Sequence, residues 1–80
     1  MATVYFSSGL ARYTGGIDSL EIDARRVQEL IQAVLVQFPQ LAEPIELMSI
    51  AVDGEIHQHA DYVALSAASE VHLVPRIAGG

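Results

Sequence analysis

The chain has 80 residues, of which 51% are hydrophobic and 18% charged, a composition that favours one small folded domain over disorder. It has four basic residues, all arginines, and ten acidic ones, which give a formal net charge of −6. This charge argues against nucleic-acid binding, because affinity for nucleic acids rests on Lys and Arg neutralising phosphates. The absence of cysteine excludes disulfides and iron–sulfur clusters, and the absence of a long apolar run or signal peptide predicts a soluble cytoplasmic domain with no membrane segment.

Two segments near the start of the chain alternate apolar and polar side chains. They are residues 3–7 and residues 19–23, and each pattern is typical of a strand with one buried face. The dipeptide Gly15-Gly16 lies between them and can adopt positive φ at little steric cost, which indicates a turn. The sequence therefore predicts a hairpin of two strands.

The periodicity then changes to that of a helix. Apolar residues recur every three or four positions from residue 27 to residue 38, which places them along one stripe of a helix. Asp23 is a candidate N-cap, and Pro39 ends the helix because it disfavours helical geometry at the residue before it. The pattern predicts one amphipathic helix over about residues 24–38 that packs on the sheet.

Three further strands are predicted after a loop around Pro44. Residues 48–52 and 70–74 alternate like the first strands, and residues 55–57 follow a tight Asp-Gly turn. Residues 58–69 allow either a loop or a short helical turn. The element order is β-β-α-β-β-β, so the sequence predicts an α+β fold in which one helix packs on a mixed sheet of four to five strands.

The last residues are not required by this fold. Pro75 suits the end of a strand because it lacks a ladder donor, so we expect a domain of residues 1–75 and a flexible tail of residues 76–80. Five extended residues reach about 17 Å at about 3.4 Å each. The two terminal glycines have no Cβ, so the tail can enter a channel too narrow for other residues. The alternative interpretation is a frayed terminus without function.

The end of the chain also resembles a known family. Residues 70–80, Glu-Val-His-Leu-Val-Pro-Arg-Ile-Ala-Gly-Gly, are similar to the ending of the MoaD/ThiS-like ubiquitin-like sulfur carriers, and Leu65 matches the family's leucine before a polar turn. The sequence departs from the family at residues 67–69, where Ala-Ala-Ser replaces a turn with glycine, and at Arg76, which replaces a second proline. The resemblance covers essentially the whole chain and implies the ubiquitin-like β-grasp fold.

The resemblance implies that the chain is a protein co-substrate, or the small non-catalytic subunit of a synthase such as molybdopterin synthase, rather than an enzyme. An E1-like enzyme would use ATP to adenylate the carboxylate of Gly80, and a rhodanese or cysteine desulfurase type donor would supply persulfide sulfur to form a thiocarboxylate. That group would donate sulfur to a synthase in a molybdopterin, thiamine or cysteine type pathway. The residues that present it to the partner enzymes would be Gly79, Ala78, Ile77 and Arg76.

The strand before the tail predicts a surface for those partners. If Val71 and Leu73 are buried, alternation leaves their neighbours on the opposite face of the sheet, beside outward side chains of the first strand. A partly apolar face next to the tail is suited to bind a partner protein. The candidate docking residues are Tyr5, Ser7, His72 and Val74.

No cofactor site is expected in the chain itself. His57 and His59 are two residues apart and would share a strand face, but no third metal ligand is evident. Gly15-Gly16 lacks the Lys-Ser/Thr and the following helix of a phosphate-binding loop. Neither metal nor nucleotide binding is predicted.

Two other functions fit the same residues. The chain can be a ubiquitin-like modifier joined through Gly80 to lysines of other proteins, or a non-covalent β-grasp binding module. The module would keep its function without Gly79 and Gly80. A modifier would produce isopeptide-linked species of higher mass, whereas a carrier would produce free thiocarboxylate.

Overall fold

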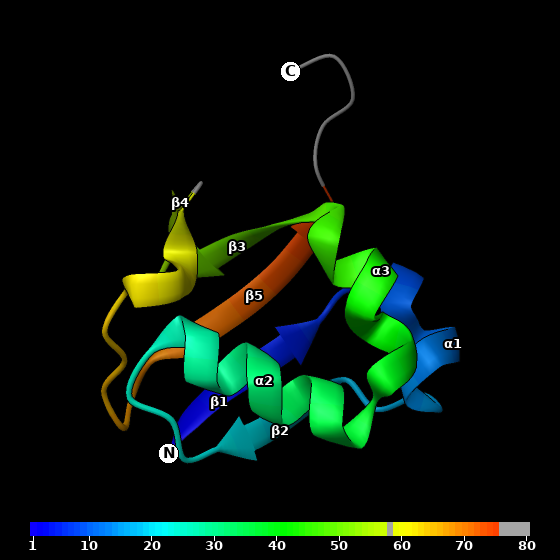
Figure 1. Cartoon of the computed structure of the whole chain (residues 1–80), viewed down its shortest axis with the longest axis horizontal. Coiled ribbons are helices and arrows are strands. Elements are labelled where there is room, and N and C mark those ends of the chain that lie inside the picture. Colours follow the sequence, from blue (N-terminus) through cyan, green and yellow to red (C-terminus); the bar gives the residue numbers. More distant parts are fainter. Residues whose placement is uncertain (58, 76–80) are drawn as a thin grey trace.

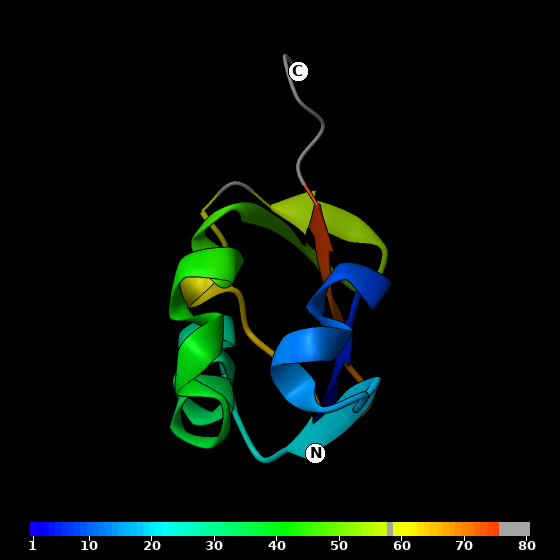
Figure 2. The ribbon, with the colours of Figure 1, turned by 90° about the vertical axis from the view of Figure 1, so that its right-hand side faces the viewer.

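The computed structural model describes residues 1–57 and 59–75 as a five-stranded sheet with helices packed against one face (Figure 1). The strands lie in the order β2-β1-β5-β3-β4 and are β1 (Ala2–Phe6), β2 (Ser19–Ile22), β3 (Met48–Val52), β4 (Glu55–His57) and β5 (Glu70–Pro75). The helices are α1 (Ala11–Thr14), α2 (Val27–Gln37) and α3 (Ala42–Glu46), with 3-10 turns η1 (Ser8–Leu10), η2 (Pro39–Leu41) and η3 (Ala60–Tyr62). Seen from the side, α2 and α3 form one layer and the strands the other (Figure 2).

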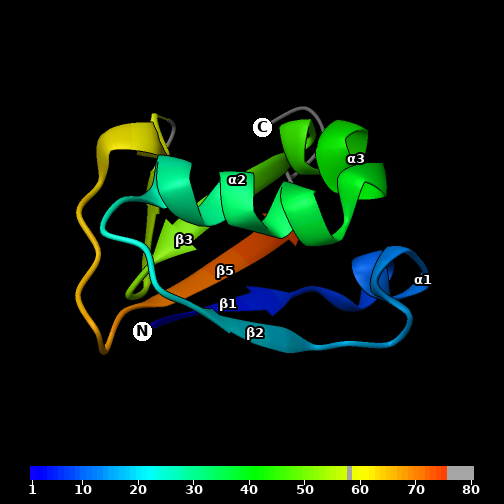
Figure 3. The same ribbon diagram turned by 60° about the horizontal axis from the view of Figure 1, so that its bottom comes forward.

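The centre of the sheet is the parallel pair of β1 and β5, whereas the other strand pairs are antiparallel (Figure 3). In this pair Val4 lies beside Val71, and Phe6 lies beside Leu73. All four side chains are buried, in one cluster with Leu30 of α2. The mixed sheet and the inward faces predicted from alternation are confirmed.

The start of α2 differs from the prediction. The helix begins at Val27, and Asp23 does not cap it, so the start near residue 24 is wrong. The backbone before the helix is instead extended and pairs with the segment after η3, where the N–H of Leu65 donates to the carbonyl of Arg25 at 2.7 Å. This long-range pairing competes with the first helical turn. The helix ends before Phe38, close to the predicted position.

The stretches expected to be loops contain additional helical turns. η1 and α1 lie between the first two strands, and η2 and α3 lie between α2 and β3. Each pair buries apolar side chains, namely Leu10 in the first and Leu41 and Ile45 in the second. Residues 58–69, for which the sequence allows either a loop or a short helical turn, contain η3, which buries Ala60. These turns are too short to show a helical period in the sequence.

The predicted Asp-Gly turn joins β3 to β4 and also supports the start of β5. Asp53 and Gly54 have φ values of 50° and 88°, as a tight hairpin turn requires. The Asp53 carboxylate accepts hydrogen bonds from the backbone N–H of Glu70 (2.9 Å) and from the hydroxyl of Ser69 (3.2 Å). The Ser69 hydroxyl also accepts from the N–H of Ser66 (2.9 Å). Serine side chains thus hold the turn at residues 66–69, which precedes β5.

Replacing Asp53 by alanine is expected to lower the free energy of unfolding by about 2–3 kcal/mol, because an ionised acceptor is removed from Ser69 and Glu70. Alanine is also strained at positive φ. Asp53→Asn is the matched control, since asparagine tolerates this φ and keeps one acceptor oxygen. Its free energy of unfolding should fall by less than that of the alanine variant. Urea denaturation measures both. An alanine variant as stable as the original chain would contradict this role of Asp53.

Candidate functional site

The end of β5 determines where the C-terminal residues leave the sheet. β5 lies between β1 and β3, and its last residue, Pro75, pairs with Met48 at the start of β3. Any group carried at the C-terminus is therefore joined to a central strand of the sheet rather than to an edge. The predicted site residues Arg76, Ile77, Ala78, Gly79 and Gly80 lie outside the described residues.

Three of the four predicted docking residues lie together on the face of the sheet opposite to its buried face. The buried face is the one on which α2 and α3 lie (Figure 2). Tyr5 of β1 is in register with His72 of β5, and their rings stack with centroids 4.5 Å apart and an interplanar angle of 11°. Val74 follows two residues along β5 and shares this face, since Val71 and Leu73 point into the core. The structure thus gathers aromatic and apolar side chains beside the end of β5.

Two residues that the sequence pattern did not single out extend this face. Ala51 of β3 is in register with His72 and with Ile56 of β4, so all three side chains point the same way. Ile56 is 66% exposed. Alternation places Ala51 and Ile56 on a face, but only the strand register shows that it is the face of His72. We call Tyr5, Ala51, Ile56, His72 and Val74 the outer patch.

The outer patch has a polar margin on the side away from Pro75. The register places Thr3 between Glu21 and Glu70, and a Glu70 carboxylate oxygen lies 3.7 Å from the Nε2 atom of His72. The side chains of His72 and Glu70 are 44% and 60% exposed, so a charge pair between them stabilises the fold little. Toward Pro75 the patch continues with Val74, which is in register with Ser49 of β3.

Ser7 occupies a different environment from the other predicted docking residues. It follows β1, which ends at Phe6. Its hydroxyl oxygen is buried and has no hydrogen-bond partner among the described residues. Ser7 therefore offers no exposed hydroxyl to a partner.

The described part of the chain contains no group of three or more His, Cys, Asp or Glu side chains that could hold a metal ion. His57 and His59 thus have no third ligand within residues 1–57 and 59–75. Over the same residues, no helix has both the length and the apolar character needed to cross a bilayer.

Comparison with protein families finds that the model of the ThiS family matches residues 5–80. The match runs from the end of β1 through the other strands and the helices to the Gly-Gly ending. A search of curated proteins finds no match.

Solved structures of several small proteins have the same fold. A chain of the Amycolatopsis orientalis BexX/CysO complex superposes with a TM-score of 0.85 at 20% identity, with 100% of both chains covered. The small archaeal modifier protein SAMP1 of Methanosarcina acetivorans gives 0.83 at 17% identity, covering 99% of this chain and 95% of that one. A chain of the complex of subunits 1 and 2 of the Helicobacter pylori molybdopterin-converting factor gives 0.70 at 19% identity, covering 99% and 97%. These similarities confirm the ubiquitin-like β-grasp fold.

Proposed function

The chain belongs to the ThiS family of ubiquitin-like sulfur carriers, and on this basis we propose that its Gly80 carboxylate is converted to a thiocarboxylate that donates sulfur in the biosynthesis of a cofactor or metabolite. The observation that carries the proposal is the family match, which extends through the Gly-Gly ending to residue 80. The product would serve a molybdopterin, thiamine or cysteine type pathway. The chain acts as a co-substrate of other enzymes and supplies no acid, base or metal.

The carboxylate must be activated before sulfur can be added. A free carboxylate does not react with a sulfur nucleophile at neutral pH, because the leaving group would be oxide or hydroxide. Transfer of AMP from ATP to the Gly80 carboxylate releases pyrophosphate and gives an acyl-adenylate. A donor persulfide displaces AMP to form an acyl disulfide, and a second donor thiol cleaves the S–S bond. The donor is left with a disulfide and Gly80 with a thiocarboxylate.

The chemistry requires three protein partners. They are an E1-like adenylating enzyme that uses ATP, a sulfur donor of the rhodanese or cysteine desulfurase type, and a synthase that accepts the sulfur. Proteins of the same fold form complexes with BexX and with a second subunit of the molybdopterin-converting factor, which supports a protein partner of the synthase type. The carrier contributes a docking surface, the outer patch, beside the strand that leads to residues 76–80.

Intact mass after incubation with ATP, an adenylating enzyme and a persulfide donor tests the proposal. The expected product is heavier by the exchange of one oxygen for one sulfur, localised to Gly80. The chain contains no cysteine, so a thiol-alkylating reagent should label only the thiocarboxylate and should leave the unreacted chain unchanged. The activating enzyme used should be one that supports thiolation of another carrier of this family and is shown to bind this chain. If the mass of this chain does not change with such an enzyme, the proposal is refuted.

The outer patch is expected to contribute to recognition by the adenylating enzyme. Ile56→Asp places a charge on an exposed apolar residue of the outer patch and should raise the KM for the carrier about tenfold, because an unpaired charge is costly to bury against an apolar partner surface. Val36→Asp is the matched control, because Val36 is 83% exposed on α2, in the opposite layer. Pyrophosphate release measures both. Equal KM values for the two variants would exclude the outer patch from this contact.

A protein-modifier function is the second candidate, favoured by the structural similarity to SAMP1, a small archaeal modifier protein. Activation at Gly80 would be the same, but the acceptor would be a lysine amine of another protein. Isopeptide-linked species that disappear with Gly80 would support the modifier. A chain that keeps its cellular function without Gly79 and Gly80 would instead be a binding module.

A further inference from the structure

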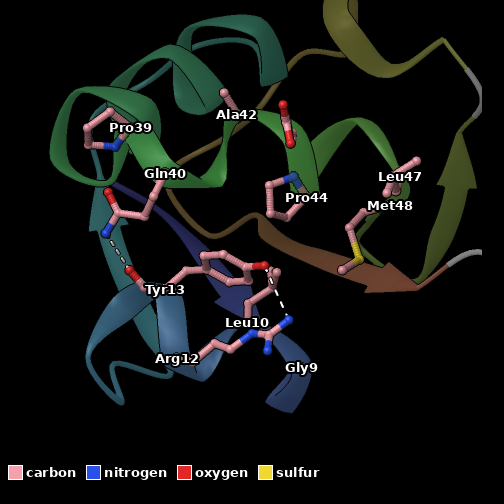
Figure 4. Close-up of a pocket in the computed structure, with 11 residues that line it drawn as sticks. Gly9, Leu10, Arg12, Tyr13, Pro39, Gln40, Ala42, Pro44, Leu47 and Met48 are labelled. Atoms are coloured by element: carbon pink, nitrogen blue, oxygen red, sulfur yellow. Dashed lines mark hydrogen bonds between the residues drawn. The ribbon is translucent and has the colours of Figure 1, made fainter.

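A cleft opens between the helical turns that follow β1 and those that precede β3 (Figure 4). Leu10, Arg12 and Tyr13 line it from η1 and α1, and Pro44, Leu47 and Met48 line it from α3 and the start of β3. Its volume is about 590 Å³, within the range of sites that hold a ligand. None of the residues of the outer patch lines it, so it is a separate surface.

Arg12 is held in place on one side of the cleft. Its Nη2 atom donates to the hydroxyl of Tyr13 at 3.3 Å, and its Cζ atom lies 5.1 Å from the centroid of the Tyr13 ring. The backbone of Tyr13 is tied to the other side of the cleft, because its carbonyl accepts a 2.7 Å hydrogen bond from the side chain of Gln40 (Figure 4). Because the guanidinium is already held in place, binding a ligand loses less side-chain conformational entropy.

The guanidinium retains capacity for an anionic ligand. It has five N–H donors, and within the described part of the chain no carboxylate lies within the 4.0 Å of an ion pair with Arg12. Glu43 also lines the cleft, so its negative charge disfavours a multiply charged anion such as a phosphate. One carboxylate is the group that best fits Arg12, because its two oxygens match the planar fork of N–H donors.

The opposite side of the cleft is apolar and partly exposed. Leu47 is 71% exposed, and it adjoins Met48 and Pro44 across from Arg12 (Figure 4). Small molecules are usually enclosed over most of their surface, whereas Arg12 and Leu47 are both open to solvent. This geometry suits a polypeptide segment lying across the cleft.

We propose that this cleft binds a segment of a partner protein that carries one carboxylate next to an apolar side chain, with the carboxylate on Arg12 and the apolar group against Leu47 and Met48. The binding itself does not depend on the chemistry at Gly80. Because Met48 pairs with Pro75, the bound segment would lie near the end of β5. Under the proposed function, that segment would belong to a protein that handles the C-terminal residues.

The test is an NMR titration of the full, isotope-labelled chain with acetyl-Leu-Asp-Leu-amide. The expected result is saturable shifts at Arg12, Tyr13 and Leu47. The peptide with asparagine in place of aspartate has the same shape without the charge and should bind about tenfold more weakly, as expected for losing a hydrogen bond between charged groups. No shifts at these residues, or equal binding of the two peptides, would overturn the proposal.

Variants of exposed residues separate the two halves of the cleft. Arg12→Gln should weaken binding of the aspartate peptide about tenfold and remove the preference over asparagine. Leu47→Ser should weaken both peptides equally. Arg26→Gln, the same charge change at the start of α2, should leave the affinity unchanged.

Three outcomes of these titrations would count against the proposal. A similar loss in Arg26→Gln would reveal a general charge effect. Acetate binding as tightly as the peptide would reassign the cleft to small anions. An Arg12→Gln chain that still prefers the aspartate peptide would remove Arg12 from the site. Sulfur loading of Gly80 is measured separately by mass, so failure of the proposed function and failure of this proposal give different results.

Discussion

A chain that lacks Gly80 is expected to take up no sulfur, while its free energy of unfolding stays that of the full chain. Removal of one extended residue withdraws the terminal carboxylate by about 3.4 Å. Reacting atoms must approach to about 3–3.5 Å, and an error of about 1 Å can cost a hundredfold in rate. A carboxylate anchored at Pro75 and shortened by one residue therefore falls outside the reach of adenylation.

The stability of this variant is expected to be unchanged because the core cluster consists of residues between Ala2 and Leu73. The matched control is Gly80→Ala, which keeps the chain length and the carboxylate but adds a Cβ. This variant should take up sulfur more slowly than the original chain and faster than the shortened chain. Full sulfur loading of the shortened chain, measured by intact mass, would contradict the assignment of Gly80. A shifted urea midpoint would show that Gly80 also stabilises the domain.

Leu30→Ala is expected to lower the free energy of unfolding by about 2–5 kcal/mol. Leu30 is 0% exposed on α2 and packs in the cluster that joins this helix to β1 and β5. α2 is the longest helix of the described chain, so a cavity beneath it weakens the main contact between the two layers. A domain of 80 residues has a total stability of about 4–12 kcal/mol. The variant should therefore lose a large part of this stability and unfold at a lower urea concentration than the original chain.

Val36→Ala on the same helix is the control for Leu30→Ala. The Val36 side chain is 83% exposed, so its truncation should change the free energy of unfolding by less than about 0.5 kcal/mol. Urea denaturation of both variants should show the same slope, since the surface exposed on unfolding is nearly unchanged. Equal losses in the two variants would contradict the packing of α2 on the sheet.

The strands were predictable from the sequence because a half-buried strand repeats every two residues. The burial of Val4 and Phe6 in β1 and of Val71 and Leu73 in β5 follows from that alternation, whereas their pairing does not. The start of α2 was not predictable in the same way. Its apolar stripe gives the helix, but the first turn is displaced by backbone pairing of Arg25 with Leu65, forty residues away in sequence, and no local pattern contains this information.

The candidate site also contains residues that the sequence predicts and residues that only the structure identifies. Alternation along β5 was enough to place His72 and Val74 on the face opposite to the core. Adding Ile56 required knowing that β3 pairs with both β4 and β5. The cleft around Arg12 required the packing of two short helical segments, α1 and α3, which are too short to leave a periodic pattern.

The parallel pairing of β1 and β5 also has a mechanical consequence. Ala2 begins one strand and Pro75 ends its neighbour, so tension between these two points pulls the strands along their length in opposite directions. The hydrogen bonds between β1 and β5 then share the force and must break together. Tension across the open end of the β3–β4 hairpin would instead break the hydrogen bonds of that hairpin one after another. A protein machine that grips the C-terminal end while the other end is held would meet the most resistant direction of this fold.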